Sequence, residues 1–221
     1  MKTLIWDLPL RIFHWALAAL VVMAWVSVEI LEDLDIHFLC GYGILGLILF
    51  RLIWGVVGPE HARFSAFVKG PSAILAYLRG DASHYRGGHN PLGALSVLFL
   101  LAVVGLQATT GLFTDDEYYY FGPLNSYVSS DVVGVMSNLH HLNVNVIIAA
   151  IALHLAAIAF YRVVKKENLV TPMITGKKDD SEKKFSAISD SKFGLAIVIA
   201  LLVTGVVIGI ASLEVEVAVG Y

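Results

Sequence analysis

The stretch Leu139-His140-His141-Leu142, together with His154, lies in a segment that contains no Asp, Glu, Lys or Arg between Asp131 and Arg162. His140 and His154 are 14 residues apart, and helical steps of about 100° place the two imidazoles within about 40° of one face. Along the axis they are about 21 Å apart, roughly two thirds of a ~30 Å hydrocarbon core. This spacing predicts a cofactor held by histidine near each side of a membrane.

The composition is that of an integral membrane protein. The 221 residues are 57% hydrophobic and only 15% charged, with a mean hydropathy of +0.75, which lies outside the usual range for a soluble domain. The single cysteine, Cys40, excludes an intrachain disulfide and a Cys-x-x-Cys-His site for covalent haem. We predict an all-α membrane bundle with a four-helix core and a fifth transmembrane helix, from five apolar segments: residues 12–28, 38–57, 92–113, 135–164 and 193–213.

Positive charge is confined to one side of the predicted bundle. All 15 Lys and Arg residues fall at the N-terminus, at the inner ends of the second and fourth predicted helices, or in segments 58–91 and 162–192. By the positive-inside rule, the N-terminus is therefore cytoplasmic and the C-terminus lies on the other side. These basic residues are expected to meet lipid phosphate and not nucleic acid.

Depth in the membrane sorts the histidines into two pairs. His14 lies about one turn inside the first predicted helix on the cytoplasmic side, where an interfacial histidine is the alternative interpretation. His37 begins the second helix at the outer level of His140; a loop histidine is the alternative there. Gly41, one turn after His37, lacks a Cβ where a flat macrocycle would approach the backbone. The pairs are therefore His14 with His154 and His37 with His140.

Two pairs of imidazoles from different helices are what two six-coordinate haems need. With both axial positions filled by neutral imidazole, no position stays open for oxygen chemistry, and one-electron transfer is favoured. His141 is a poorer ligand than His140, because its 13-residue spacing from His154 leaves the two side chains about 140° apart. We assign it to the surroundings of the site or to an interface.

Several polar residues are candidates for contacts to haem propionates or quinone. Arg51, near the inner end of the second helix, either extends to lipid headgroups or pairs with an acid such as a propionate, with equal weight. His89, ahead of Pro91, is a third ligand candidate, or a helix-cap residue that orients a loop or binds a propionate. Two positions remain possible for a quinone site. One is the inner interface, near Arg11, Arg51 and His89, and the other is the outer aromatic cluster at residues 118–121.

Two further patterns concern helix packing. The outer third of the third predicted helix carries Gln107, Thr109 and Thr110, which either contact a polar ligand or form hydrogen bonds to another helix. Gly205-x-x-x-Gly209 in the last helix predicts close packing against another helix.

Four motifs occur in order along the chain: Arg11-x-x-His14-Trp15, His37 with Arg51-x-x-Trp54-Gly55, His89-Asn90-Pro91-x-Gly93, and His140-His141 with His154. On this combination the chain resembles, over about residues 1–165, the bacterial cytochrome b561 and nickel-iron hydrogenase b-type cytochrome family. The resemblance implies a four-helix di-haem b domain in the bacterial inner membrane that exchanges electrons with quinone and a redox partner. It implies His14, His37, His140 and His154 as the axial ligands of the haem irons. A short first outer loop and a fifth helix after a basic linker depart from the pattern and speak against a hydrogenase partner.

The resemblance and the residues together give the expected organisation and function. We expect a di-haem domain (1–165), a charged cytoplasmic linker (166–192), and a fifth helix with a short periplasmic tail (193–221). Two haem b groups, and quinone as a further cofactor, would carry electrons between the quinone pool and a periplasmic partner such as a c-type cytochrome. We expect an electron-transfer subunit of an oxidoreductase more than a self-sufficient enzyme, and a homodimer is left open. The alternatives are a stand-alone quinone-dependent oxidoreductase, such as a superoxide:quinone oxidoreductase, and the b-type subunit of a hydrogenase.

Overall fold

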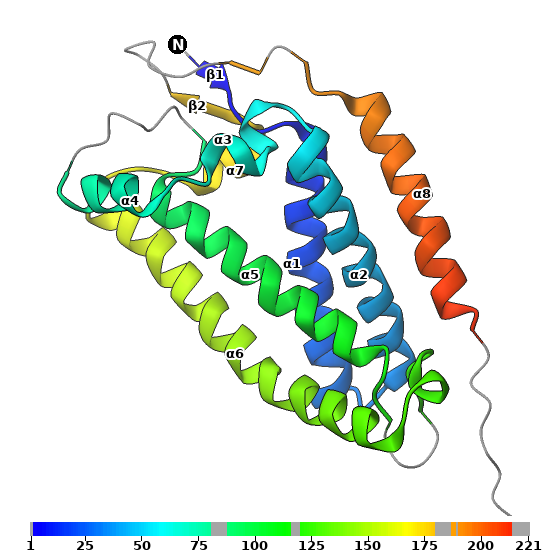
Figure 1. The fold of residues 1–221 in the computed structure, drawn as a ribbon. Coiled ribbons are helices and arrows are strands. Elements are labelled where there is room, and N and C mark those ends of the chain that lie inside the picture. The colour runs from blue at the N-terminus through cyan, green and yellow to red at the C-terminus, as the bar shows by residue number, and fades with distance from the viewer. Residues whose placement is uncertain (1, 81–87, 116–119, 180–186, 189, 214–221) are drawn as a thin grey trace, which may run out of the picture. The chain divides into compact units, whose positions relative to one another are not determined.

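The computed structural model describes residues 2–80, 88–115, 120–179, 187–188 and 190–213. Within these residues, five helices are long and apolar enough to cross a bilayer (Figure 1). They are α1 (Leu8–Glu29), α2 (Leu34–Val57), α5 (Pro91–Gly111), α6 (Ser130–Val163) and α8 (Phe193–Ala211). The prediction of an all-α membrane protein with five spanning helices is confirmed. Both α1 and α6 begin before the predicted apolar segments, because their first turns include polar residues.

Shorter elements lie between the spanning helices. Between α2 and α5 are η1 (Glu60–Ala62), α3 (Phe64–Phe67) and α4 (Pro71–Leu78), and η2 (Asn125–Tyr127) precedes α6. The segment after α6 contains α7 (Val170–Thr175) and β2 (Lys177–Asp179), and β1 (Lys2–Leu4) precedes α1.

The chain divides into two compact units, which are described separately. The first unit comprises Met1–Trp15, Arg51–Leu100 and Ala150–Ile199. The second unit comprises Ala16–Phe50, Leu101–Ala149 and Ala200–Tyr221. Each of the five spanning helices therefore contributes one part to each unit.

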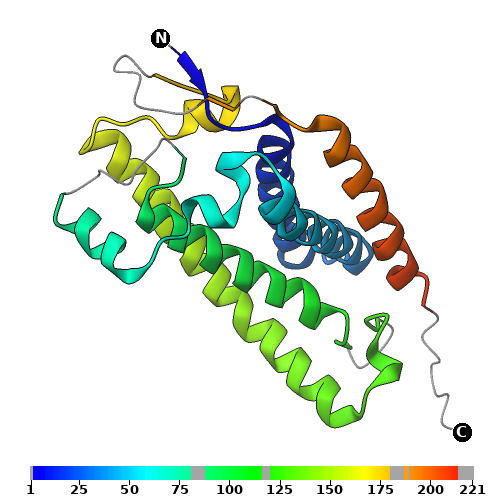
Figure 2. The ribbon, with the colours of Figure 1, turned by 45° about the horizontal axis from the view of Figure 1, so that its top comes forward.

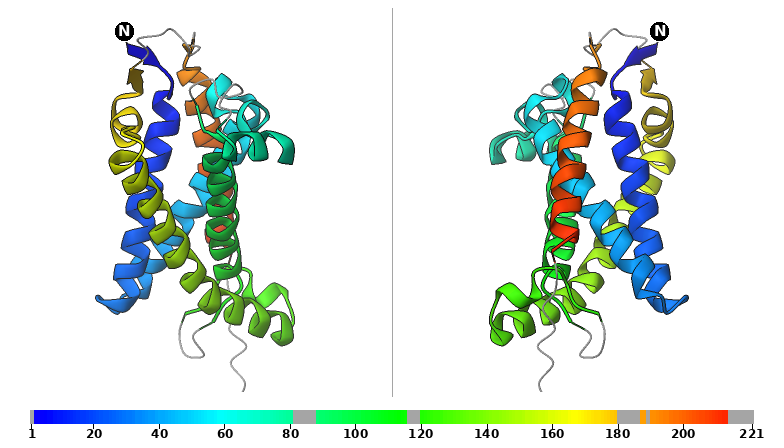
Figure 3. Two further views of the ribbon diagram at one scale, coloured as in Figure 1. Left: turned by 90° about the vertical axis from the view of Figure 1, so that its left-hand side faces the viewer. Right: turned by 90° about the vertical axis from the view of Figure 1, so that its right-hand side faces the viewer.

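In the first unit, the segment after α6 forms backbone hydrogen bonds with the first residues of the chain. β1 and β2 form an antiparallel pair in which Lys2 faces Asp179 and Leu4 faces Lys177. The backbone N–H groups of Ile5 and Trp6 both donate to the Gly176 carbonyl, at 2.8 and 3.1 Å. Figure 3 shows β1 beside β2 and α7 beside the first turns of α1. Composition predicted only a charged linker here, and the strand and helix within it were not foreseen.

The first turn of α1 is capped by a buried carboxylate. Asp7 is 1% exposed, and its Oδ1 accepts hydrogen bonds from the Leu10 N–H at 2.9 Å and from Trp54 Nε1 at 3.2 Å. Asp is a favoured N-cap residue because its side chain satisfies a free N–H of the first turn. The second bond ties the start of α1 to the end of α2, where Trp54 is fully buried.

Proline marks the start of two helices. Pro71 opens α4 after Gly70, and Pro91 opens α5. The interpretation of His89 as the cap residue is wrong: the cap is Asn90, whose Oδ1 accepts the Gly93 N–H at 2.7 Å. The amide oxygen of Asn90 is one residue closer to the helix and reaches its first turn, whereas the His89 ring packs elsewhere.

In the second unit, α5 and α6 lie side by side (Figure 2) and are joined by polar side chains. Asn143 Nδ2 donates to the Val103 carbonyl and to Gln107 Oε1, both at 2.8 Å. Gln107 Nε2 in turn donates to the His140 carbonyl at 3.1 Å. Of the two roles left open for Gln107, hydrogen bonding to a neighbouring helix is the one observed.

Helix α8 packs in the second unit through valines and not through its glycines. A Cβ placed on Gly46 of α2 would lie 3.6 Å from Val207 and 3.8 Å from Val203. The positions of Gly205 and Gly209 meet nothing within 4 Å among the described residues. The predicted close packing of the Gly-x-x-x-Gly face is therefore not made within the described part of this chain.

Gly176 is the residue at which we expect substitution to damage the fold. Its φ is +80°, and an added Cβ would lie 2.7 Å from the Trp6 carbonyl oxygen. Since an L-residue in the left-handed region costs about 1–2 kcal/mol, Gly176→Ala should lower the unfolding temperature of the protein in detergent. Gly70→Ala is the matched control, because Gly70 has φ −68° and open space around it. Equal unfolding temperatures for the two variants would contradict this account.

Candidate functional site

His37 and His140 face one another in the second unit. Their ring centroids are 6.1 Å apart, and the ring planes are inclined by 82°. With metal–imidazole bonds of about 2 Å and roughly 1 Å from each ligating nitrogen to its ring centre, two imidazoles on one metal ion have centroids about 6 Å apart. The observed separation therefore fits a pair of axial ligands.

The other ring nitrogens of this pair are held by backbone carbonyls. His37 Nδ1 lies 2.9 Å from the Ala24 carbonyl oxygen, and His140 Nδ1 lies 3.1 Å from the Gln107 carbonyl oxygen. Because a carbonyl only accepts, each Nδ1 carries the proton and each Nε2 keeps its lone pair. Histidine ligands in metal sites are oriented by this kind of hydrogen bond. Both imidazoles are thus in the tautomer that binds a metal through Nε2.

Two glycines border this pair. A Cβ on Gly111 would lie 3.0 Å from His140 Cε1, which is tighter than ordinary contacts. A Cβ on Gly41 would meet nothing within 4 Å, so one turn after His37 the backbone is uncovered. The space beside the backbone at Gly41 is compatible with the close approach of a flat macrocycle.

His14 and His154 lie in the first unit and are close enough to interact electrostatically. The His14 ring packs edge-on against Trp15, with centroids 5.0 Å apart. Its Nδ1 is buried and has no hydrogen-bond partner among the described residues. A buried ring nitrogen without a partner is rare in proteins, so this atom indicates a bound group that the polypeptide does not supply.

Arg51 is a buried cation in the first unit. It is 1% exposed, its guanidinium carbon lies 4.6 Å from the centre of the Phe64 ring, and neither Nη1 nor Nη2 has a hydrogen-bond partner in the described part of the chain. Extension to lipid headgroups, one of its two predicted roles, would require exposed nitrogens. An unpaired buried guanidinium is costly, and an acidic group such as a haem propionate fits the unfilled donors.

His89 and Arg11 complete the polar residues of this unit. The His89 ring lies between Trp6 and Phe67, with both centroid distances 4.6 Å. Burial, aided by the nearby positive charge of Arg51, lowers the pKa of His89 to about 3, so its imidazole is neutral at physiological pH. Its Nδ1 is buried without a partner among the described residues. Arg11 Nη1 donates to the Ile174 carbonyl, and its buried Nε has no partner among the described residues.

The aromatic cluster predicted at residues 118–121 is described only in part. Residues 118 and 119 lie outside the described residues. Tyr120 stacks on Phe38, with centroids 6.1 Å apart and an inclination of 24°, and Phe121 forms a β-bridge with Asp115. Of the described residues of this cluster, Tyr120 thus packs onto the beginning of α2.

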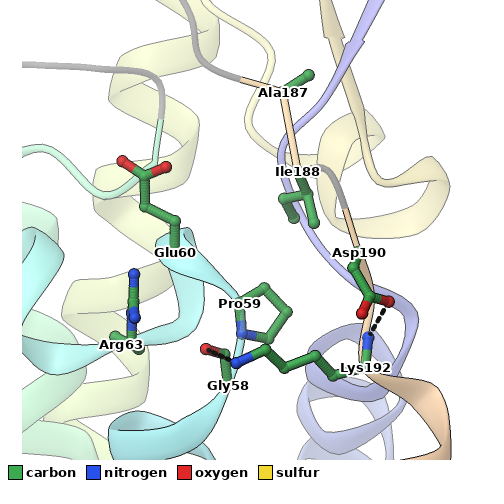
Figure 4. A pocket seen from close by; sticks show the side chains of 8 residues that line it. All are labelled: Gly58, Pro59, Glu60, Arg63, Ala187, Ile188, Asp190 and Lys192. Carbon is green, nitrogen blue, oxygen red and sulfur yellow. Dashed lines mark hydrogen bonds between the residues drawn. The ribbon is translucent and has the colours of Figure 1, made fainter.

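A cavity of about 220 Å³ lies in the first unit beside the end of α2 (Figure 4). Lys192 Nζ donates to the Val57 carbonyl at 2.8 Å, and Asp190 Oδ1 accepts the Lys192 N–H at 2.8 Å. A lysine at the last carbonyls of a helix stabilises the helix end. None of the histidines predicted as haem ligands lines the cavity. We infer that Lys192 and Asp190 join the start of α8 to the end of α2. Its lining residues are Gly58, Pro59, Glu60, Arg63, Ala187, Ile188, Asp190 and Lys192.

Five apolar spanning helices with histidines paired between them define a multi-pass membrane protein whose interior can hold a metal or a cofactor. The chain matches the family model of the prokaryotic cytochrome b561 over residues 5–176, so it belongs to that family. It is thus a membrane b-type cytochrome of electron transfer. A relative from Azotobacter chroococcum mcd 1, named a probable Ni/Fe-hydrogenase B-type cytochrome subunit, is 24% identical over 214 residues, covering 78% of this chain and 86% of the relative. No solved structure matches the chain significantly.

Two residues that the structure places at these sites were not predicted from the sequence. Asp7 was not singled out, although an Asp directly before an apolar helix is a capping signal. Asn143 is buried between α5 and α6, and an Asn in an apolar segment was the available signal. Thr110, for which the same two roles were left open as for Gln107, has its Oγ1 3.2 Å from His140 Nδ1 on the neighbouring helix.

Asn143 should stabilise the protein through its two bonds to α5. Asn143→Leu removes the donor to Gln107 Oε1 and the side-chain bond to the Val103 carbonyl, so we expect a loss of about 1 kcal/mol of unfolding free energy, in the range of hydrogen bonds between membrane helices. Thermal unfolding in detergent measures the loss. Asn145→Leu, on the exposed side of the same helix, is the control, and an equal effect of both substitutions would contradict the assigned role.

Proposed function

We propose that this protein carries electrons across the bacterial inner membrane through two b-type haems, each held by two histidines. His37 and His140 bind one haem, and His14 and His154 bind the other. The observation that carries the proposal is the His37–His140 pair, with centroids 6.1 Å apart and both Nδ1 atoms engaged by backbone carbonyls. A haem bound in this way supplies a one-electron centre with no open coordination position.

The polar cluster of the first unit supports the placement of the second haem. Arg51 offers two buried, unpaired donors, and His89 lies close enough to feel the charge of both Arg51 and His14. A propionate of a haem on His14 and His154 would fill these donors. Arg11, whose Nε is also unpaired, is a further contact for a propionate or a quinone.

The orientation follows from the distribution of positive charge. With the N-terminus cytoplasmic, the His14–His154 site is on the cytoplasmic side, and the His37–His140 site is on the periplasmic side. Residues 1–165 then form the di-haem domain, 166–192 the cytoplasmic linker, and 193–221 the fifth helix with its periplasmic tail. Electrons pass between the quinone pool and a periplasmic partner, for which a c-type cytochrome is our first candidate.

A hydrogenase is the second candidate partner, since the Azotobacter chroococcum relative bears the name of a hydrogenase cytochrome subunit. Reduction of the purified protein by quinol, measured with and without a co-purified partner, separates an electron carrier from a stand-alone oxidoreductase. Turnover of quinol with a small oxidant in the absence of any partner would contradict the carrier.

The ligand assignment predicts haem content. The wild-type protein should contain two haems per chain. His37→Ala and His154→Ala should each reduce this number to one, because a non-covalent haem that has lost one axial imidazole binds the protein more weakly. Haem per chain and the reduced-minus-oxidised absorption spectrum measure this. His141→Ala is the control, since His141 is exposed and next to His140 in sequence, and it should keep both haems. Absence of haem from the wild-type protein would overturn the proposed function.

Arg51 should tune the haem of the first unit. At an effective dielectric constant of about 20, a positive charge on the order of 10 Å from an added electron would stabilise the reduced state by roughly 1–2 kcal/mol. Arg51→Met should therefore lower the midpoint potential of the His14–His154 haem by several tens of millivolts, as measured by redox potentiometry. Arg79→Met, at an exposed position after α4, should leave the potential unchanged. A rise in potential for Arg51→Met would contradict the placement.

A further inference from the structure

Asp7 is a buried acid that uses only one of its two oxygens. Oδ1 accepts from the Leu10 N–H and from Trp54 Nε1, whereas Oδ2 is buried and has no hydrogen-bond partner among the described residues. A helix cap needs one acceptor and no negative charge, because Asn and Ser cap as well as Asp. The cap therefore explains Oδ1 and leaves the second oxygen and the charge of Asp7 unexplained.

Arg51 is the charged group that acts on Asp7. It lies one helical turn from Trp54 on α2, which is the side chain that binds Asp7 Oδ1. The two charges interact electrostatically, yet Asp7 and Arg51 form no ion pair within 4 Å, and both Nη atoms remain without a hydrogen-bond partner in the described part of the chain. His89, ahead of α5, and His61, on η1, are further titratable groups of this cluster, and His14 on α1 also acts on His89.

We propose that Asp7 takes up a proton on Oδ2 when the redox centre of the first unit is reduced, and releases it on oxidation. This inference rests on the proposed function. One electron enters the site from quinol, and one proton enters from the aqueous phase on the same side, so that the carboxylate becomes a carboxylic acid. The net charge of the cluster is then the same before and after the step.

Coulomb's law gives the reason for the coupling. In a buried cluster an added electron is only weakly screened, and it raises the proton affinity of a nearby carboxylate. Burial already raises the pKa of the Asp7 carboxyl above its ordinary value, against the opposing effects of the Leu10 and Trp54 hydrogen bonds and of the Arg51 charge. If Arg51 also binds a propionate, its positive charge stabilises the carboxylate form of Asp7 less. By linkage, the dependence is reciprocal, so protonation of Asp7 favours reduction.

The experiment is a redox titration of the purified protein over a series of pH values. Between the pKa values of Asp7 in the oxidised and reduced states, each tenfold fall in proton concentration should make reduction of the His14–His154 haem up to tenfold less favourable, which is about 59 mV for one electron. In Asp7→Asn this dependence should disappear, while the cap and the Trp54 contact keep an acceptor oxygen. Asp33→Asn is the matched control, because Asp33 Oδ1 caps α2 by accepting the Ile36 N–H at 3.0 Å. It should keep the full dependence.

A graded variant and a direct observation of the proton complete the test. Trp54→Phe removes a donor to Oδ1, which should move the pH-dependent range upward without abolishing it, and this variant remains informative if Asp7→Asn fails to fold. Redox-difference infrared spectra should show a carboxylic acid C=O band that grows on reduction of the wild type and is absent in Asp7→Asn. A pH-independent potential in the wild type, or an unchanged dependence in Asp7→Asn, would overturn the role of Asp7 while two bound haems still upheld the proposed function. A haem count without the His14–His154 haem would overturn both.

Discussion

An imidazole between apolar membrane helices is stable only when both of its ring nitrogens have partners. In the second unit, one nitrogen of each histidine is satisfied by the backbone: His37 by the Ala24 carbonyl of α1, and His140 by the Gln107 carbonyl of α5. Each of these carbonyls belongs to a helix other than the one that carries the histidine it binds. The second nitrogen of each ring thereby remains available to a bound group, which we propose is the haem iron, and α1, α2, α5 and α6 each contribute one residue to this arrangement.

The sequence was sufficient to predict the five spanning helices. It was also sufficient to sort His14, His37, His140 and His154 into the two pairs that lie in different units. Long apolar segments predict helices through their length, and the 14-residue spacing of His140 and His154 places them at two levels of α6. The hydrogen bonds that orient the rings could not be predicted in the same way. The contacts of Thr110 and Asn143 depend on the rotation of α5 against α6, which apolar sequences with little amphipathic pattern do not specify.

The segment after α6 shows a second limit of composition. A run rich in Lys and Asp predicts a solvated connection, and the three residues Lys177–Asp179 carry no signal of a strand. Their pairing with β1 depends on a partner more than 170 residues away in sequence, together with the Gly176 carbonyl that receives two N–H groups. Long-range pairing of two such short segments leaves no local pattern to detect. His89 was misassigned for a related reason, because the distinction between it and Asn90 depends on which side chain reaches the Gly93 N–H.

The pairing of β1 with β2 determines when the contacts at the start of the chain can form during synthesis. At 5–20 residues per second, roughly 10–30 s of synthesis separate the appearance of Leu4 from that of its partner Lys177. During this interval α1 has been translated, but the carbonyls of Met173 and Ile174, which receive the Trp15 and Arg11 side chains on either side of His14, do not yet exist. The contacts around His14 therefore form only after Ala24, His37, Gln107 and His140 have all been synthesised, so a cofactor loaded during synthesis would find the His37–His140 pair complete first.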